Sequence, residues 1–334
     1  MSAENVRLYM EDCVSGMEKR LGENEVDMCV TSIPFGALFM YSGKTEDIGN
    51  NADGTDLEAG QFGLHTRFFA EQLHRVLKPG AVACIHIQQL LRYKNTHGWI
   101  GKRDFRGSVV NLFIHAGFHW TGEFVIPKNP QIIAKRLSLH SLMFQTGRED
   151  ARMLAPAVND YVMIFRKPGD GTKLRALYDT NKNPGGWVTT EEWINWAHGV
   201  WDDIRETDVL EGYRQGRSDE NEKHVCPLQL EVIARCVRLY SAPGELVLDP
   251  FMGIGSTAWV TQCDLRLPHL PSTVDIVAHV RKCIGFELKE SYYKLSKANL
   301  ARAAKKLKEL SKDLLTGLSD ASKKKLAKKK GKAA

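Results

Sequence analysis

A turn with two glycines has the residue types of a nucleoside-cofactor site. An apolar run ends at Asp249, Gly253 and Gly255 follow, and a helix is predicted over 256–262. Glycines let the backbone approach a ligand closely, and the first N–H groups of a helix are free to bind a polar or anionic group. The spacing Gly-x-Gly-x-x-Ala, which ends at Ala258, fits the strand-to-helix fingerprint of dinucleotide-binding proteins.

An acid lies at the end of the next predicted strand, which covers 282–288. This acid, Glu287, is placed to hold the hydroxyl groups of a ribose. Ordinary tight turns share the glycine spacing, so the turn by itself does not specify a ligand. The turn and the acid together predict a nucleoside-cofactor site.

A second stretch, Ser32-Ile33-Pro34-Phe35, follows an apolar strand predicted over 26–31. Open α/β sheets place their chemistry at the carboxyl ends of strands. The ring of Phe35 could stack on a planar base, while the Ser32 hydroxyl and nearby carbonyl groups accept hydrogen bonds from its amino group. The same residues are also typical of a strand that a proline interrupts. The stretch taken alone favours this second interpretation.

In this order, the two stretches resemble those of the amino-directed DNA methyltransferases that use S-adenosylmethionine. The catalytic motif of that family is (Asp/Asn/Ser)-Pro-Pro-(Tyr/Phe), and its cofactor motif reads Asp-Pro-Phe-x-Gly-x-Gly. The catalytic motif precedes the cofactor motif, as in the β group of the family. The sequence as a whole is most similar to phage and prophage members. The segments 159–169, 222–229 and 285–293 agree with the resemblance, which covers most of residues 1–300.

The resemblance implies which residues form the site. Ser32, Ile33, Pro34 and Phe35 would be catalytic. The implied cofactor-binding residues are Asp249, Pro250, Phe251, Gly253, Gly255, Ser256, Thr257, Glu287, Leu288, His224 and Pro227. His224 is interpreted as ordering a loop, with direct catalysis the less favoured role. The cofactor would be S-adenosyl-L-methionine, and no metal is expected.

The target would be an exocyclic amino group of a base flipped out of double-stranded DNA, at a cost of about a few kcal/mol. In the family, Ser at the first motif position tends to accompany cytosine and Asp adenine, so Ser32 favours N4 of cytosine and leaves N6 of adenine as the alternative. The chain departs from the family in two places. Ile33 stands where the first proline is usual, and an inserted loop is expected over 264–280.

Strand and helix patterns alternate along the chain, which predicts an α/β fold. We expect a Rossmann-like methyltransferase sheet with its motifs in permuted order and inserted target-recognition segments. Strands are predicted over 6–9, 81–87, 120–126 and 161–165, and helices over 62–77, 109–116, 227–240 and from 291 onward. The expected divisions are a catalytic half (1–165), a target-recognition segment (166–222), a cofactor-binding half (223–296), and a helix extension with a basic tail (297–334).

Charge is distributed unevenly. The net charge of the 334 residues is +6, but residues 297–334 carry 13 Lys/Arg and three Asp/Glu, which leaves −4 on residues 1–296. A DNA surface on the body must therefore be a local patch, for which 88–108 and 128–158 are candidates. Side chains that could contact phosphates, or equally form a solvated face, are Arg92, Lys94, Lys102, Arg103, Arg106, Lys128, Lys135 and Arg136. The lysine-rich tail could add non-specific DNA affinity or only solubility.

Composition limits the remaining classes. Hydrophobic residues make up 43% of the chain, no apolar run approaches the roughly 18 residues of a membrane span, and no signal-peptide pattern begins it. A cytoplasmic location in a bacterial or phage-infected host cell is expected. The seven scattered cysteines favour free thiols. Trp187, Trp193, Trp196 and Trp201 are expected to form a small local core in preference to stacking on bases.

Two other classes stay open. An NAD-dependent oxidoreductase would use the glycine turn but would leave Ser32 to Phe35 unexplained. A non-catalytic DNA-binding protein on a decayed methyltransferase scaffold would account for Ile33 and the inserted loop. The expected partner is double-stranded DNA, and a homodimer is left open.

Overall fold

A mixed sheet of seven strands forms the centre of the residues that the computed structural model describes. These residues are 5–35, 45–48, 57–92, 94–137, 143–171, 188–212, 227–266 and 279–309. The strands are β1 (Val6–Tyr9), β2 (Val26–Ser32), β3 (Leu77–Gln88), β6 (His119–Ile126), β7 (Asp160–Arg166), β8 (Leu246–Asp249) and β9 (Lys282–Phe286). Their order in the sheet is β1-β9-β8-β2-β3-β7-β6. The first five in this order run parallel, and β7 is antiparallel to both of its neighbours.

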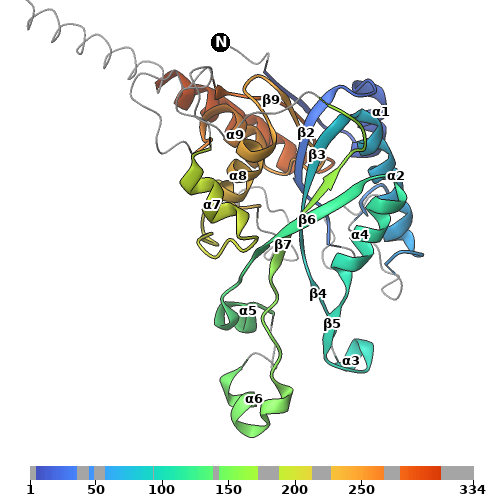
Figure 1. The fold of residues 1–334 in the computed structure, drawn as a ribbon, viewed down its shortest axis with the longest axis vertical. Helices are drawn as coiled ribbons and strands as arrows, with labels where there is room; N and C mark the ends of the chain where they lie inside the picture. The colour runs from blue at the N-terminus through green and yellow to red at the C-terminus, as the bar shows by residue number, and fades with distance from the viewer. Residues whose placement is uncertain are drawn as a thin grey trace, which may run out of the picture.

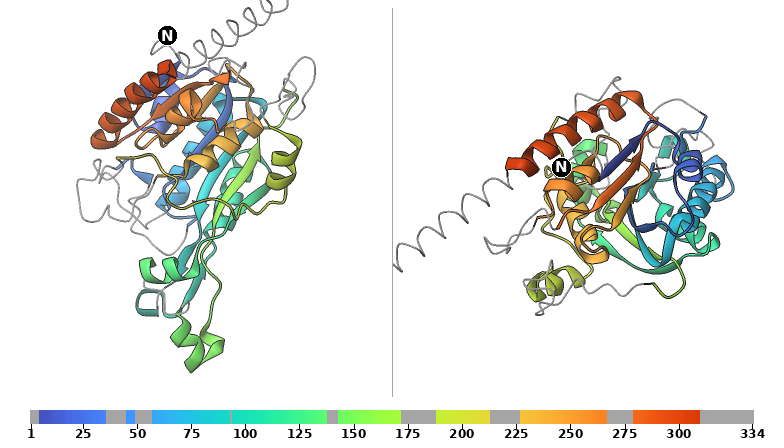
Figure 2. Two further views of the ribbon diagram at one scale, coloured as in Figure 1. Left: turned by 90° about the vertical axis from the view of Figure 1, so that its left-hand side faces the viewer. Right: turned by 90° about the horizontal axis from the view of Figure 1, so that it is seen from above.

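Helices cover both faces of this sheet, as Figure 1 and Figure 2 show. The first face packs against α1 (Cys13–Arg20), α2 (Gln61–Val76) and α4 (Phe105–His115), and the second against α7 (Thr190–Ala197), α8 (Leu230–Tyr240) and α9 (Ser256–Cys263). Strand β3 illustrates the division, because Ala83 and Ile85 join the first core while Cys84 joins the second. The period-2 alternation of a strand sends neighbouring side chains to opposite faces. The predicted α/β class is confirmed.

Most predicted elements exist, with shifted ends. Helix α4 begins at Phe105 because the Asp104 side chain caps it, accepting a hydrogen bond from Gly107 N at 2.9 Å. Strand β3 begins at Leu77, directly after α2, so the Lys-Pro-Gly turn ends the helix but already belongs to the strand. A helix also covers 290–309. None of the helices within the described ranges is long and apolar enough to cross a membrane.

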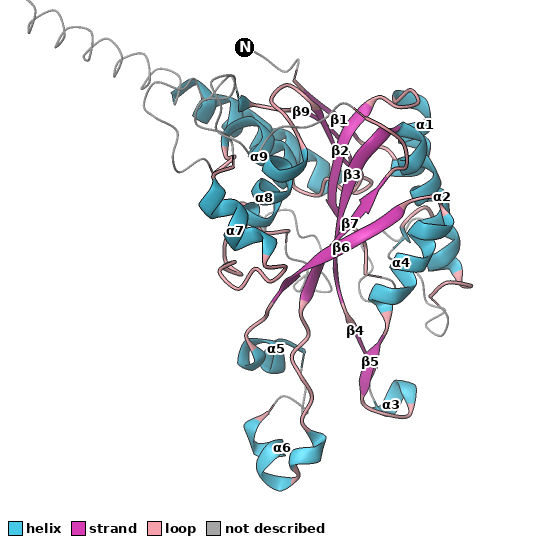
Figure 3. Ribbon diagram, in the orientation of Figure 1, coloured by secondary structure: helices cyan, strands magenta, loops and turns pink. Residues whose placement is uncertain are grey.

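Two arms extend from one end of the sheet, where β3 and β6 finish and β7 begins (Figure 3). The first arm contains β4 (Leu90–Arg92), α3 (Lys94–His97) and β5 (Gly101–Arg103), with β4 antiparallel to β5. The second contains α5 (Pro130–Leu137), α6 (Phe144–Glu149) and a 3-10 turn (Ala151–Met153). These arms lie within the segments 88–108 and 128–158, which were expected to contact DNA. They lie at the carboxyl ends of the parallel strands.

The tryptophan-rich segment packs on the second face of the sheet. Trp196 and Trp201 are buried in that core, and Trp201 stacks on Phe124 with ring centroids 4.2 Å apart. The expectation of a core role is therefore confirmed for these two residues. It is wrong for Trp193, which is 45% exposed, and Trp187 lies outside the described residues.

Candidate active site

The two predicted stretches meet at the carboxyl edge of the sheet. Strand β8 pairs in parallel with β2 on one side and with β9 on the other. The carboxyl ends of parallel strands lie at the same edge. Ser32, the glycine turn (residues 249–257) and Glu287 consequently lie close together, although they are far apart in the chain.

Asp249 ties the glycine turn to the strand that carries Ser32. Thr31 Oγ1 donates to Asp249 Oδ1 at 2.6 Å, and Thr257 Oγ1 donates to Oδ2 at 2.6 Å. The backbone N–H of Phe251 also donates to Oδ1, at 3.1 Å. Burial raises the pKa of Asp249 to about 6, although all three hydrogen bonds favour the ionised form. Asp249 was predicted to bind cofactor, but these carboxylate contacts join the two halves of the site.

The glycine turn has the backbone that its sequence predicts. Gly253 and Gly255 have φ values of +54° and +90°, in the region that L side chains rarely adopt. A Cβ at Gly255 would lie 3.1 Å from Ser296 Cβ, whereas one at Gly253 would meet nothing nearer than 4.0 Å. Helix α9 starts directly after Gly255, so its free N–H groups face this turn. The turn is thus closed against the protein at Gly255 and open at Gly253, as a ligand cradle requires.

Glu287 lies beside the open part of this turn. Its Oε2 accepts from Gly253 N at 2.8 Å and its Oε1 from Lys289 N at 2.7 Å. Its own N–H donates to Tyr9 O at 3.0 Å, just beyond the end of β9. Burial raises the pKa of Glu287 to about 7. Each carboxylate oxygen has a second lone pair, so Glu287 can still accept a ligand hydroxyl.

The other predicted cofactor residues divide by position. Ser256 and Thr257 are buried in the first turn of α9, and the Phe251 ring packs on Phe69 with centroids 5.1 Å apart. Pro227 comes shortly before α8, which begins at Leu230. Pro250 and Leu288 directly follow Asp249 and Glu287. His224 and most of the expected inserted loop, 264–280, lie outside the described residues.

The stretch predicted to be catalytic, Ser32 to Phe35, contacts β3. Ser32 Oγ lies 2.9 Å from His86 Nδ1, and the Phe35 ring lies 5.9 Å from the His86 ring between centroids. Ile33 N donates to His86 O at 3.3 Å, and the Ile33 side chain is buried in the first core. Proline has no N–H, so the family's usual residue could not make this bond. The departure at Ile33 therefore extends the β2–β3 ladder by one hydrogen bond before Pro34.

The predicted phosphate contacts occupy varied environments. Lys94 and Lys135 are exposed, and only the backbone of Arg136 is described. The Arg92 guanidinium lies 5.0 Å from the centroid of the Trp99 ring, and Arg106 pairs with Glu123. Lys102 Nζ donates to Ala157 O at 3.1 Å.

Two of the eight do not match the expectation of a solvent-facing cation. Arg103 is buried, at 8% exposure. Lys128 is 9% exposed, and its Nζ lies 2.6 Å from Asp160 Oδ2. The start of β7 supplies this acid beside Lys128, so the lysine turns inward. Lys128 is therefore not available to a phosphate in this structure.

Sequence reasoning missed Thr31, His86 and Asp160 as site residues. Thr31 lay within the stretch discussed, but no role was predicted for it. His86 interrupts an otherwise apolar strand, and Asp160 begins another. A buried polar residue needs a hydrogen-bonding partner, so such interruptions were the available signal.

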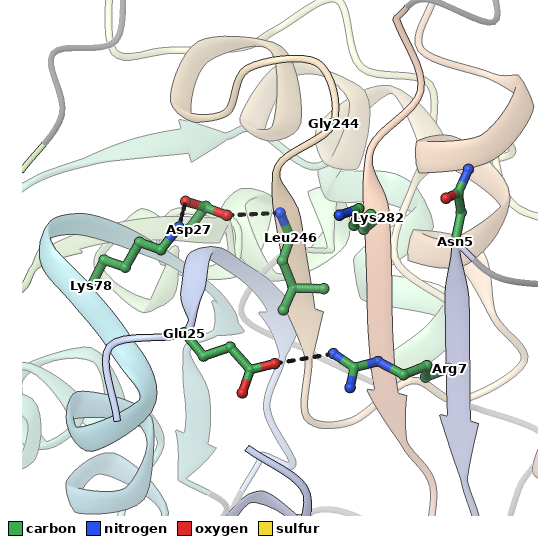
Figure 4. Close-up of a pocket in the computed structure, with 8 residues that line it drawn as sticks. All are labelled: Asn5, Arg7, Glu25, Asp27, Lys78, Gly244, Leu246 and Lys282. Atoms are coloured by element: carbon green, nitrogen blue, oxygen red, sulfur yellow. Dashed lines mark hydrogen bonds and ion pairs between the residues drawn. The ribbon is translucent and has the colours of Figure 1, made fainter. Parts of the chain in front are cut away.

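A polar cavity of about 250 Å³ lies at the opposite edge of the sheet (Figure 4). Its lining residues are Asn5, Arg7, Glu25, Asp27, Lys78, Gly244, Leu246 and Lys282. Arg7 pairs with Glu25 at 3.2 Å and Lys78 with Asp27 at 2.5 Å, so most of its charge is balanced within the protein. This cavity is separate from the glycine turn.

Comparison with known proteins agrees with this geometry. In sequence, Type II methyltransferase M.MjaI of Methanocaldococcus jannaschii is 25% identical over 194 residues, which are 56% of this chain and 55% of that protein. The chain thus spans about half the length of this relative.

Two solved structures share the fold. TTHA0409 of Thermus thermophilus, complexed with S-adenosyl-L-methionine, has a TM-score of 0.60 at 20% identity, covering 89% of this chain and 93% of that one. PvuII DNA methyltransferase, described as cytosine-N4-specific, has a TM-score of 0.58 at 16% identity, covering 93% and 94%. A family model described as DNA methylase (N6_N4_Mtase) matches residues 26–298, from β2 through the glycine turn and into the last helix. The chain therefore belongs to this DNA methylase family, as its two motifs predicted.

Proposed function

We propose that the chain transfers a methyl group from S-adenosyl-L-methionine to an exocyclic amino group of a base in DNA. The observation that carries this proposal is the Asp249 carboxylate. It accepts one hydrogen bond from Thr31, which precedes Ser32, and one from Thr257 in the glycine turn. A base held at Ser32 and a cofactor held at the turn would therefore occupy one edge of the sheet, within reach of each other.

The residues present fit this cofactor. Gly253 leaves room for close approach, the N-terminus of α9 offers free N–H groups, and Glu287 can accept ribose hydroxyls. When bound, S-adenosyl-L-methionine would supply an electrophilic methyl group on a sulfonium. An NAD-dependent oxidoreductase is the weaker alternative, because it assigns no role to Ser32, Pro34 and Phe35.

The chemistry that these side chains would perform is positioning and electrostatic stabilisation. The lone pair of an exocyclic amino group is delocalised into the ring, so the nitrogen must become more tetrahedral before it attacks. Acceptors directed at its two N–H bonds favour that change, and the available ones are Ser32 Oγ and the carbonyl of Ile33 or Pro34. The half-buried Phe35 ring would stack on the base.

We infer cytosine N4 as the target atom, with adenine N6 as the alternative. Ser32 supports cytosine, since family members with this base tend to have Ser at the first motif position. The description of the PvuII enzyme as cytosine-N4-specific is consistent with it. A hydroxyl and a carboxylate can both accept an N–H bond, so the residue type favours one base without excluding the other.

We further propose that double-stranded DNA approaches between the two arms and that the target base is flipped toward Ser32. The arms extend from the edge at which the site lies, and Lys94 and Lys135 are exposed on them (Figure 3). The described part of the expected target-recognition segment 166–222 packs largely on the sheet. The arms are therefore the better candidates for reading sequence.

The proposal is tested on DNA from cells that express the protein. Sequencing with modified-base detection should find the modification at one defined sequence, and mass spectrometry of the digested DNA should identify it as N4-methylcytosine. Detection of only N6-methyladenine would overturn the choice of base and retain the reaction. Unmodified DNA, with NAD binding in equilibrium dialysis and no binding of S-adenosyl-L-methionine, would overturn the function.

A further inference from the structure

Ser32 begins a row of polar side chains. The other members of this row lie outside the motif Ser32 to Phe35. Ser32 Oγ lies 2.9 Å from His86 Nδ1. His86 Nε2 lies 3.2 Å from Asp160 Oδ2, an electrostatic contact that is not aligned as a hydrogen bond. Lys128 Nζ lies 2.6 Å from the same Asp160 oxygen. His86, Asp160 and Lys128 are 7%, 5% and 9% exposed. We call Ser32, His86, Asp160 and Lys128 the polar row.

Strand register assembles this row. Ser32 and His86 are Cα partners in the parallel β2–β3 pair. Asp160 opens β7, opposite Gln88 of β3 and Ile126 of β6, and so stands next to His86 and to the segment that carries Lys128. Gln88 Nε2 donates to Asp160 Oδ1 at 3.0 Å, which leaves Oδ2 to His86 and Lys128.

Charge within the row is nearly balanced. Burial disfavours the ionised form of Asp160, but His86 and Lys128 outweigh burial and hold the pKa of Asp160 below its usual value. Because the Lys128 ammonium already neutralises this carboxylate, the row needs no second cation. Asp160 of β7 contacts His86, and Lys128, which follows β6, contacts the same Asp160 oxygen.

We propose that His86 is a positioning residue for Ser32, held by Asp160 and Lys128 as a neutral imidazole with its proton on Nε2. Its unprotonated Nδ1 then accepts a hydrogen bond from the Ser32 hydroxyl, and both lone pairs of Ser32 Oγ remain for an N–H group of the target base. This inference rests on the proposed methyl transfer. Protonation of His86 would reverse the arrangement, because Nδ1–H would donate to Oγ and the Ser32 hydroxyl would meet the amino group as a second donor.

A purely structural role for the same row has different consequences. It predicts that changes at His86 lower stability but leave the pH dependence of turnover unchanged. The positioning role predicts that turnover requires an unprotonated Nδ1 on His86, so turnover falls in acid only while His86 is present.

The rate test measures transfer of tritiated methyl groups to unmodified bacterial genomic DNA between about pH 5 and 9. His86→Gln should lower kcat about 100-fold at neutral pH, as misplacement of a reacting group can. It should also remove the acid limb of the profile, with S-adenosyl-L-methionine affinity retained. An unchanged kcat and an unchanged pH profile in His86→Gln would overturn the proposal.

A double-mutant cycle asks whether His86 acts through Ser32. Adding His86→Gln to Ser32→Ala should cause no further loss of kcat, because no hydroxyl remains to be oriented. Losses that multiply would show that His86 acts independently of Ser32.

The wild-type chain provides a measurement that needs neither activity nor a variant. Nitrogen-15 NMR of the imidazole rings should find His86 in the Nε2–H tautomer at neutral pH. An Nδ1–H tautomer or an imidazolium at neutral pH would overturn the inference even if methyl transfer is observed. The expected tautomer without methyl transfer to any DNA would instead contradict the proposed function.

Discussion

Each half of the site contains one buried aspartate, and the pKa values of these two residues shift in opposite directions. Asp249 and Asp160 are each 5% exposed. The pKa of Asp249 is raised to about 6, because its partners are two hydroxyls and one backbone N–H. The pKa of Asp160 is lowered, because its partners include His86 and the Lys128 ammonium. At equal burial, the charge of the partners decides in which direction the pKa of a carboxylate shifts.

The two halves are also assembled differently. The glycine turn is local, and its contacts are mainly to backbone, with Glu287 accepting from Gly253 N and Met252 N donating to Phe286 O. The polar row takes its members from three strands and one connection. Substitutions should therefore affect the turn through backbone conformation and the row through side-chain charge and hydrogen bonding.

The largest effect is expected at the glycine turn. Gly253→Val should abolish binding of S-adenosyl-L-methionine with little loss of stability beyond about 1–2 kcal/mol of left-handed backbone strain, because the new side chain enters open space. Gly255→Val should abolish binding and also destabilise the fold, since Ser296 is only 3.1 Å from a Cβ there. Calorimetric titration and urea unfolding of both variants measure the two quantities. Full affinity in a folded Gly253→Val protein would remove the turn from the cofactor site.

Ser32→Ala should lower kcat by about 10²–10³, the cost of losing one preorganised hydrogen-bonding group at a reacting centre. Affinity for S-adenosyl-L-methionine should stay near wild type, because Ser32 contacts β3 and not the turn. Thr257→Val is the matched control for Ser32→Ala, because it also removes one hydroxyl, here the one in the cofactor half that donates to Asp249. A normal rate in Ser32→Ala would contradict the mechanism.

Asp160→Asn should destabilise the protein by about 3 kcal/mol near pH 7, because it leaves the Lys128 ammonium buried without its counter-ion. Chemical denaturation at several pH values checks this effect. The folded pKa of Asp160 is depressed, so its contribution is present above the unfolded value near 4 and is lost below it. The difference between variant and wild type should therefore shrink in acid. The double variant Asp160→Asn, Lys128→Met should recover part of the loss.

Asp249→Asn should show the opposite pH dependence. The folded pKa is raised, so ionising Asp249 lowers wild-type stability as pH rises from about 4 to about 6, by a total on the order of 3 kcal/mol at 1.36 kcal/mol per unit. Asparagine does not ionise, so the stability of the variant relative to wild type should increase by a similar amount across that interval. A constant difference from pH 4 to 8 would show that Asp249 does not titrate there.

The smallest effect is expected on the arms. Lys135→Gln should reduce the log–log slope of DNA affinity against salt by about 0.9, the contribution of one phosphate contact. Lys128→Met, at a buried lysine, should leave that slope unchanged. Equilibrium binding to unmodified duplex DNA at several salt concentrations measures both. Equal slopes for wild type and Lys135→Gln would exclude Lys135 from the DNA surface.

Local features of the chain were accessible before the structure. The strand-and-helix alternation predicted the α/β class, and β1, β2, β3, β6 and β7 were expected near their observed positions. The glycine turn was predicted from its Gly-x-Gly-x-x-Ala spacing after an apolar run. The role of Ser32 was predicted from the resemblance of its stretch and of the glycine turn to the two family motifs. Each of these signals lies within a few consecutive residues.

The polar row and the link through Asp249 depend on tertiary structure. Lys128 read as one cation among eight, and only the position of Asp160 showed that it turns inward. His86 and Thr31 belong to apolar strands whose periodicity says nothing about which polar group lies opposite. That pairing depends on strand order and register, which the packing of the whole sheet and its two helical layers sets. A single sequence encodes local backbone preference in adjacent residues, whereas the partner of a buried charge is determined only when distant strands pair.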